Sequence, residues 1–197
     1  MGGLVNAKNP DLSNAPLNFD LISGLWGIYF SIIGVRYVNP EMIPATGAAI
    51  IAANHLTTID PFGVGQPTPR RVHFMAKKEL FGSALSRWYM LSGNAFPVER
   101  GKMDLTAIKT ALRILQGGQL LVIFPQGTRG GTDAKGGASF LALKAKVPVI
   151  PVGITLKRNW FGGQRYTFRY GAAIPPVGSI EEHTSAVLKA IEMLQHD

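Results

Sequence analysis

The sequence has no cysteine among its 197 residues, and this absence excludes several kinds of chemistry. A disulfide framework, a thiolate metal site and a cysteine nucleophile all require a thiol. Charged residues are also scarce, at 16% of the chain against 46% apolar residues. This balance is too apolar for a disordered chain and poor in charge for a freely soluble one, so we expect part of the surface to face lipid.

Acidic residues are in short supply, with twelve Asp and Glu against twenty Lys and Arg and a formal net charge of +8. Such a balance favours an anionic partner, either nucleic acid or an acidic membrane surface. The chain carries no helix-turn-helix, zinc-finger, RRM or KH signature. We therefore expect no nucleic-acid partner and an anionic membrane surface instead.

We expect no secretory signal in the first residues, because Lys8 stands alone and its neighbours are polar. Residues 1–16 mix Gly, Asn, Pro and Asp without an apolar period, which is typical of a flexible tail. We expect the protein to be membrane-associated on the cytoplasmic side.

The longest apolar run starts at residue 17, and residues 21–35 contain no charge. This run falls short of the ~20 residues that a spanning helix needs. Trp26, Tyr29 and Tyr37 suit the membrane interface, where a ring lies in lipid with its polar end in water. A buried core helix and a spanning helix are the alternatives, but we predict that residues 17–35 form an apolar helix associated with the membrane interface.

After this helix, short apolar runs alternate with helical patterns, which is the signature of an α/β layer fold. Asp104 can cap one helix, and Ser179 with Glu182 forms a capping box for the last helix. We predict a single domain over residues 36–197, with a central mixed sheet flanked by helices. Strands are expected at residues 36–38, 48–53, 72–76, 95–98, 119–124, 147–154 and 165–170.

The first polar block, Asn-His-Leu-Thr-Thr-Ile-Asp, directly follows the apolar strand at 48–53. Residues five apart on a helix point about 140° from each other, so His55 and Asp60 can meet only across a loop. Pro61 suits the first position of a helix, which makes Asp60 its cap and turns the carboxylate back along the loop. Asp60 can then hold one nitrogen of His55 and leave the other as a base. The alternative is that Asn54 is a turn residue and Asp60 only a cap.

Two further blocks place an arginine after an apolar strand. Arg100 follows the strand at 95–98, where its planar guanidinium can bind a phosphate or simply pair with Glu99 in solvent. The strand at 119–124 opens into the turn Pro-Gln-Gly-Thr-Arg-Gly-Gly, which contains Arg129. Its free N–H groups and its cation suit an anion or an oxyanion, although an ordinary strand-to-helix connection is the alternative.

Two prolines interrupt the last of these apolar strands. Pro148 and Pro151 lie within residues 147–154, and neither can donate a backbone hydrogen bond. We therefore expect this strand at an edge of the sheet or along the wall of a groove.

These four blocks, in this order and at these separations, resemble the glycerolipid acyltransferases that make phosphatidic acid from 1-acylglycerol-3-phosphate. The resemblance runs from about residue 34 to about residue 176 and includes Val-His-Phe-Met-Ala-Lys-Lys-Glu-Leu-Phe and Phe-Pro-Val-Glu-Arg-Gly. It implies that His55 is the general base and Asp60 its orienting partner. It also implies that the glycerol phosphate is bound by Arg100, Gly127, Thr128 and Arg129. We expect Asn54, Lys77 and Gln126 to support the site.

The resemblance implies direct acyl transfer without cofactor or metal. His55 would take a proton from the sn-2 hydroxyl of the lysophospholipid, and the oxygen would attack the thioester of acyl-CoA or acyl carrier protein. Phosphatidic acid would form with no covalent acyl-enzyme. An acyltransferase for another lysolipid or an amine-bearing lipid, or a lipid-binding relative without catalysis, is the alternative.

One position departs from the family pattern, which usually reads Phe-Pro-Glu-Gly-Thr-Arg. Gln126 stands in place of that glutamate. The amide keeps the shape and hydrogen-bonding reach of the side chain but loses its charge, so a role that needs a carboxylate is lost while a structural role can survive. We favour a structural role, because two arginines and a glycine-rich loop already supply positive potential.

Overall fold

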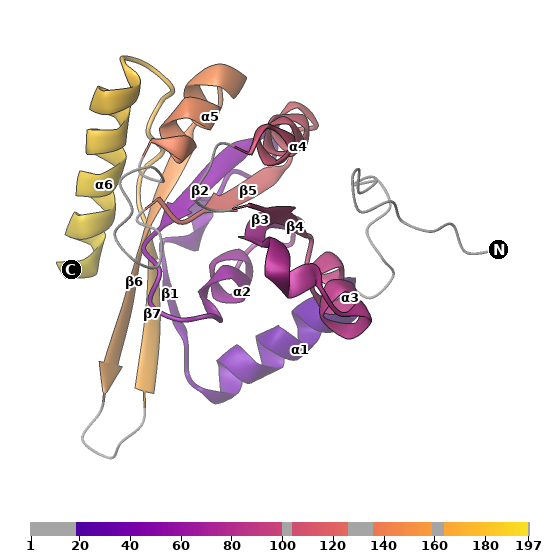
Figure 1. Ribbon diagram of the computed structural model, residues 1–197. Helices are drawn as coiled ribbons and strands as arrows, with labels where there is room; N and C mark the ends of the chain where they lie inside the picture. The colour runs from indigo at the N-terminus through magenta and orange to yellow at the C-terminus, as the bar shows by residue number, and fades with distance from the viewer. Residues whose placement is uncertain (1–18, 100–103, 126–135, 159–163, 197) are drawn as a thin grey trace.

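A computed structural model describes residues 19–99, 104–125, 136–158 and 164–196 and shows an α/β fold (Figure 1). The strands are β1 (Arg36–Val38), β2 (Ala49–Ala53), β3 (Val72–Lys77), β4 (Ala95–Val98), β5 (Leu120–Ile123), β6 (Val149–Arg158) and β7 (Gln164–Tyr170). The α-helices are α1 (Phe19–Ile32), α2 (Asp60–Gly65), α3 (Ala84–Ser92), α4 (Leu105–Gln116), α5 (Gly137–Ala145) and α6 (Ile180–His196). Two short 3-10 helices are η1 (Pro40–Met42) and η2 (Lys78–Phe81).

The sheet is mixed, as the sequence predicted, and its strand order is β1-β7-β6-β2-β5-β3-β4. From β6 to β4 neighbouring strands are parallel, whereas β7 runs antiparallel to β6 and parallel to β1. The carboxyl ends of β2, β5, β3 and β4 therefore share one edge of the sheet. That edge is where ligands usually bind in open α/β sheets, and the first three polar blocks begin there.

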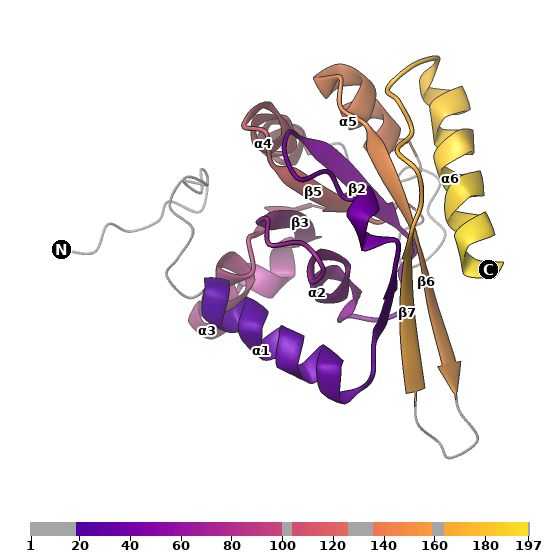
Figure 2. The ribbon, with the colours of Figure 1, turned by 180° about the vertical axis from the view of Figure 1, so that it is seen from behind.

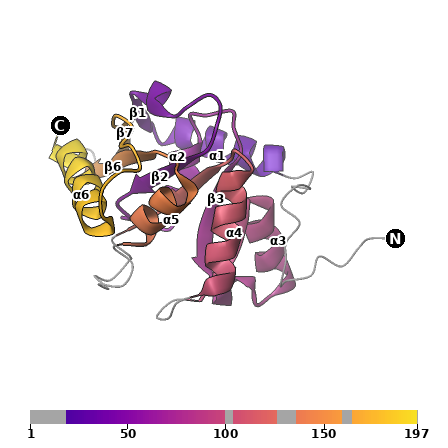
Figure 3. The ribbon, with the colours of Figure 1, turned by 90° about the horizontal axis from the view of Figure 1, so that it is seen from above.

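Helices cover both faces of the sheet (Figures 1 and 2). Figure 3 shows α6, α5 and α4 side by side, and they pack on an aliphatic core that includes Ile50, Leu121 and Val149. The opposite face is covered by α1, α2 and α3 over a core that contains aromatic residues such as Phe74 and Phe168.

Local capping explains where two predicted helices begin. The carboxylate of Asp104 accepts the N–H groups of Thr106 and Ala107 at 3.0 Å and so starts α4. Ahead of α6, the N–H of Ser179 donates to Glu182 at 2.9 Å, and the N–H of Glu182 donates back to the Ser179 hydroxyl at 3.1 Å. The predicted capping box is confirmed.

The edge position predicted for the proline-containing strand is wrong, because β6 lies between β7 and β2. Pro148 precedes the strand, and its carbonyl accepts the N–H of Ile50 at 3.0 Å. Pro151 accepts the N–H of Gly171 at 2.8 Å, just beyond the β6–β7 register that starts at Val152. In an extended strand the N and C=O of a residue point to the same side, so the missing N–H of Pro151 faces the end of β7 and interrupts little of the ladder.

The helix predicted at 17–35 is observed at Phe19–Ile32, and its two sides differ. Trp26 faces the protein, where its ring stacks on Phe62 at 4.6 Å and its indole N–H donates to the hydroxyl of Tyr89 at 3.0 Å. Tyr37 stacks on Phe168 at 5.5 Å, and burial raises the pKa of its hydroxyl. The interfacial placement predicted for Trp26 and Tyr37 is therefore wrong.

The outer side of α1 carries exposed apolar side chains. Figures 1 and 2 place this helix at the surface beside α3. Among residues 19–196 outside the gaps named above, no helix combines the length and apolarity needed to cross a membrane. The predicted tail at 1–16 lies outside the described residues. The exposed side chains are Leu21, Leu25, Ile28, Tyr29 and Ile32.

Candidate active site

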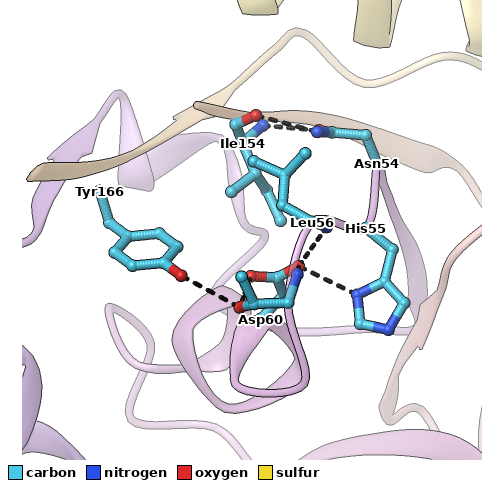
Figure 4. A network of polar contacts seen from close by, with 7 residues as sticks. Asn54, His55, Leu56, Asp60, Ile154 and Tyr166 are labelled. Carbon is cyan, nitrogen blue, oxygen red and sulfur yellow. Dashed lines mark hydrogen bonds and ion pairs between the residues drawn. The ribbon is translucent and has the colours of Figure 1, made fainter. Parts of the chain in front are cut away.

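Asn54 fixes the direction in which the chain leaves β2 (Figure 4). Its side-chain oxygen accepts the N–H of Ile154 at 2.6 Å, and its amide donates to the carbonyl of Ile154 at 2.9 Å. The side chain therefore continues the pairing of β2 with β6 one step past Ala53, which is opposite Val152. Because Asn54 is buried, both of its polar ends need these partners.

The loop that follows brings His55 and Asp60 together, with Nδ1 of His55 at 2.9 Å from Oδ2 of Asp60. The same oxygen accepts the N–H groups of Leu56 at 2.6 Å and Thr57 at 2.7 Å. The second oxygen, Oδ1, accepts the hydroxyl of Thr57 at 2.8 Å. The Asp60 side chain has no solvent exposure, so these donors replace the water that the carboxylate loses on burial.

Asp60 takes a slightly different place in the helix than predicted. It is the first residue of α2, and Ile59 occupies the cap position. Pro61 is therefore second, where its missing N–H still costs no helical hydrogen bond. The carboxylate does turn back along the loop, because its partners precede it in the chain.

The contact with Asp60 determines which nitrogen of His55 is available. An ionised carboxylate only accepts hydrogen bonds, so Nδ1 must carry the proton and Nε2 presents a lone pair. The side chain is 13% exposed, which leaves the ring reachable. Phe124, directly after β5, stacks on the imidazole with ring centroids 4.4 Å apart. The ring is thus held at one nitrogen and on one face while the other nitrogen is open to a substrate.

This arrangement suits a general base with an orienting carboxylate. In the described parts of the chain, no serine or threonine hydroxyl is hydrogen-bonded to His55, as a serine-type nucleophile would be. An imidazole held in this way can take a proton from a hydroxyl bound at its second nitrogen.

A family model described as Acyltransferase matches residues 34–155, which is more than half of the chain. The chain belongs to the acyltransferase family. The matched range includes the whole His55–Asp60 loop and the strands that hold it.

Two curated relatives of this acyltransferase carry the name 1-acyl-sn-glycerol-3-phosphate acyltransferase. The protein from Bacillus subtilis is 36% identical over 121 residues, which is 60% of this chain and 61% of the relative. The protein from Streptococcus pneumoniae is 37% identical over 134 residues, or 66% of this chain and 50% of the relative. The chain therefore spans between half and two thirds of the length of these two relatives.

The fold of this acyltransferase also matches a solved one. The crystal structure of the 1-acyl-sn-glycerophosphate acyltransferase from Thermotoga maritima aligns with a TM-score of 0.71 and 22% sequence identity. The alignment covers 90% of this chain and 78% of that one. The two proteins share the fold.

The other expected site residues of the acyltransferase are placed in part. Lys77 ends β3, two strands from β2, so it lies about 10 Å from the His55 loop at ordinary strand spacing. Glu99, which was the alternative partner for Arg100, lies with its carboxylate 4.0 Å from the ammonium of Lys78. The remaining expected residues, Arg100, Gln126, Gly127, Thr128 and Arg129, lie outside the described residues. Their described neighbours Glu99 and Pro125 follow β4 and β5 at the same edge as His55.

Sequence reasoning missed Thr57, Phe124 and Tyr166 as part of this site. The hydroxyl of Tyr166 donates to the hydroxyl of Thr57 at 3.1 Å across 109 residues of sequence. The threonine at the middle of a His-to-Asp loop was a usable signal, because its hydroxyl can reach a nearby carboxylate. Nothing local to Tyr166 indicates its partner.

Proposed function

We propose that this acyltransferase moves a fatty acyl group from an acyl thioester to the sn-2 hydroxyl of 1-acylglycerol-3-phosphate, forming phosphatidic acid for phospholipid synthesis. The observation that carries the proposal is the His55–Asp60 pair at 2.9 Å, with the second imidazole nitrogen open. The names of the two bacterial relatives support the choice of acceptor.

In the proposed reaction, Nε2 of His55 accepts the proton of the acceptor hydroxyl as its oxygen attacks the thioester carbonyl. Asp60 stabilises the imidazolium that forms. When the carbon–sulfur bond breaks, the proton passes from His55 to the leaving thiolate and the imidazole is neutral again. The thioester of acyl-CoA and that of acyl carrier protein are chemically equivalent in these steps.

The acceptor phosphate is proposed to lie towards the ends of β4 and β5, where the chain continues into Arg100 and into Gly127, Thr128 and Arg129. A planar guanidinium binds a phosphate through two parallel hydrogen bonds, and free backbone N–H groups add further donors. Lys77, exposed at the end of the intervening strand β3, adds a positive charge to the same edge.

The acyltransferase is further proposed to work at the cytoplasmic surface of a membrane. The outer side of α1 exposes Leu21, Leu25, Ile28 and Ile32, with Ile32 78% exposed. The neighbouring helix α3 exposes Leu85 and Trp88. Such a concentration of large apolar side chains marks an interaction surface, and the +8 charge favours anionic lipid. An interfacial helix fits these exposures.

An assay of the full chain tests the reaction. Wild-type protein and His55→Ala are compared with acyl-CoA or acyl carrier protein as donor and 1-acylglycerol-3-phosphate as acceptor. Turnover is expected to fall by about 10³-fold in the variant, with an unchanged circular dichroism spectrum, because the base acts in the transition state. Wild-type turnover in His55→Ala would contradict the mechanism. Faster turnover of the wild-type protein with a zwitterionic or amine-bearing lysolipid would identify that lipid as the acceptor instead.

Sedimentation with vesicles of phosphatidylglycerol tests whether the exposed side of α1 binds the membrane. Because α1 also packs on α2 through Trp26, substitution on its outer side is a sharper test than deletion. Leu25→Glu combined with Ile32→Glu is expected to weaken vesicle binding at least tenfold, about 1.4 kcal/mol. Leu105→Glu, an equally exposed leucine on α4, is the matched control. Equal binding by all three proteins would reject α1 as the contact.

A further inference from the structure

One face of strand β7 packs against the loop and helix that carry Asp60. Tyr166, Phe168 and Tyr170 alternate along β7, so their side chains point to the same face of the sheet. All are buried. Each contacts the segment of residues 57–64.

The outer contacts are hydrogen bonds and the middle one is steric. The hydroxyl of Tyr166 donates to Thr57, and that of Tyr170 donates to the carbonyl of Val64 at 2.8 Å. Between them, a β-carbon placed on Gly63 would overlap the tip of the Phe168 ring. That ring stacks on Tyr37 at 5.5 Å and on Tyr166 at 6.2 Å, so it has little room to move. Glycine at position 63 allows α2 to lie directly on β7.

The contact with Tyr166 reaches the catalytic carboxylate through one intermediate. A threonine hydroxyl has a single proton, and Tyr166 donates to the oxygen of Thr57. The proton of Thr57 is therefore committed to Oδ1 of Asp60, at 2.8 Å. Oδ2 is held by backbone N–H groups and by His55. Both oxygens are thus fixed, which sets the plane of the carboxylate that orients the imidazole.

We propose that Tyr166 is a positioning residue for acyl transfer, which fixes Asp60, and through it His55, by way of the Thr57 hydroxyl. The inference rests on the proposed function of His55 as the base. Without the tyrosine hydroxyl, Thr57 is free to turn among its staggered rotamers, and its bond to Oδ1 weakens. Small displacements of a catalytic group cost rate more than they cost stability.

Four variants of the full chain test this role. Tyr166→Phe is expected to lower kcat by about three- to tenfold with KM unchanged, because a hydrogen bond is lost but no substrate contact is. Thr57→Val should lower kcat by at least as much, and Thr57→Ser should keep at least about half of it, because serine retains the hydroxyl. The double variant Tyr166→Phe, Thr57→Val should be no slower than Thr57→Val alone.

Tyr170→Phe is the matched control. It removes a buried hydroxyl from the same strand and the same face, but that hydroxyl bonds a helix carbonyl and not the Asp60 network. Its melting temperature should fall while kcat stays within about twofold of wild type. An equal loss of kcat in Tyr170→Phe, or multiplying losses in the double variant, would overturn the proposal and leave Tyr166 a structural residue.

A second readout does not depend on turnover. In protein labelled with nitrogen-15 histidine, the Nδ1–H proton of His55 is observed directly, and its exchange with water reports how firmly Asp60 holds it. Exchange should be at least about threefold faster in Tyr166→Phe and unchanged in Tyr170→Phe. Wild-type exchange in Tyr166→Phe would also overturn the proposal. If the wild-type protein lacks acyl transfer, the proposed function fails, and this measurement still decides whether Tyr166 controls His55.

Discussion

The two faces of the sheet are built from different kinds of side chain. The face under α4, α5 and α6 is aliphatic, with Phe96 as the aromatic member of its buried cluster among the described residues. The face under α1, α2 and α3 is rich in rings, and the hydroxyls of Tyr166 and Tyr170 reach across it to α2 and its loop. Aliphatic packing has no preferred direction, whereas hydroxyls and stacked rings do. Both layers bury apolar side chains, and the aromatic layer adds the directed contacts that set the geometry of the site.

The largest effect is expected from a change at the centre of the aromatic face. Asp60→Asn should lower kcat by about 10²- to 10³-fold, because an amide with its NH₂ group in the place of Oδ2 cannot accept the proton on Nδ1 of His55. Its NH₂ group would also meet the N–H groups of Leu56 or Thr57 in place of an acceptor. Steady-state kinetics on protein with a native melting transition provides the measurement. A loss smaller than tenfold would show that the carboxylate is dispensable.

A cavity in the aliphatic face should lower stability and leave kcat unchanged. Ile191→Ala, at a fully buried position of α6, should lower the free energy of unfolding by about 2–5 kcal/mol while the folded fraction keeps its kcat. Met193→Ala, an exposed residue on the same helix, is the control and should change stability by less than about 0.5 kcal/mol. Urea unfolding gives both values. A loss of kcat in Ile191→Ala would contradict the division between the faces.

Acid should lower the free energy of unfolding, because the aliphatic face of the sheet buries two histidines. Burial lowers the pKa of His73 and of His183 below the ordinary value of 6.5, and His183 also bonds the hydroxyl of Ser139 at 2.9 Å. The unfolded chain then binds protons that the folded protein does not, so this contribution to stability is complete above pH 6.5 and declines as the pH falls below it. Urea unfolding between pH 7.5 and about 5 measures the slope. His183→Gln should make the slope shallower, and an unchanged slope would exclude His183 as its source.

The smallest effect is expected at Gln126, on the proposed acceptor side of the site. Gln126→Glu restores the family's glutamate, and we expect less than a tenfold gain in turnover, under about 1.4 kcal/mol, because an amide has the shape and hydrogen-bonding reach of a carboxylate and does not oppose a bound phosphate. Steady-state rates over a range of acceptor concentrations decide the point. A gain of tenfold or more would show that the carboxylate acts through its charge.

The central strands could be predicted because parallel strands buried on both sides are almost continuously apolar. The predictions at 48–53, 72–76 and 119–124 each lie within one residue of the observed β2, β3 and β5. The extension of β6 from residue 154 to 158 was missed, since it depends on antiparallel pairing with β7. The short helices α3 and α5 were also missed: α3 buries only Ser92 among its residues, and α5 starts at a glycine.

In the site too, local contacts could be predicted and contacts between distant residues could not. His55 and Asp60 are five residues apart, so loop geometry could predict their meeting. Asn54 is 100 residues from Ile154, and Thr57 is 109 residues from Tyr166. These partners depend on how β6 and β7 are placed in the sheet, which no local pattern specifies.

The two hydrogen bonds of the Asn54 side chain limit which amino acids can occupy its position. Its short amide serves as an acceptor for one main-chain group of Ile154 and a donor to the other, both within 3 Å. Aspartate offers two acceptors and no donor, serine is too short for both, and glutamine adds a methylene to a buried space. In a library randomised at this codon and selected for folded protein, nearly all surviving sequences should carry asparagine at this position. This holds even though Asn54 touches no substrate in the proposed reaction.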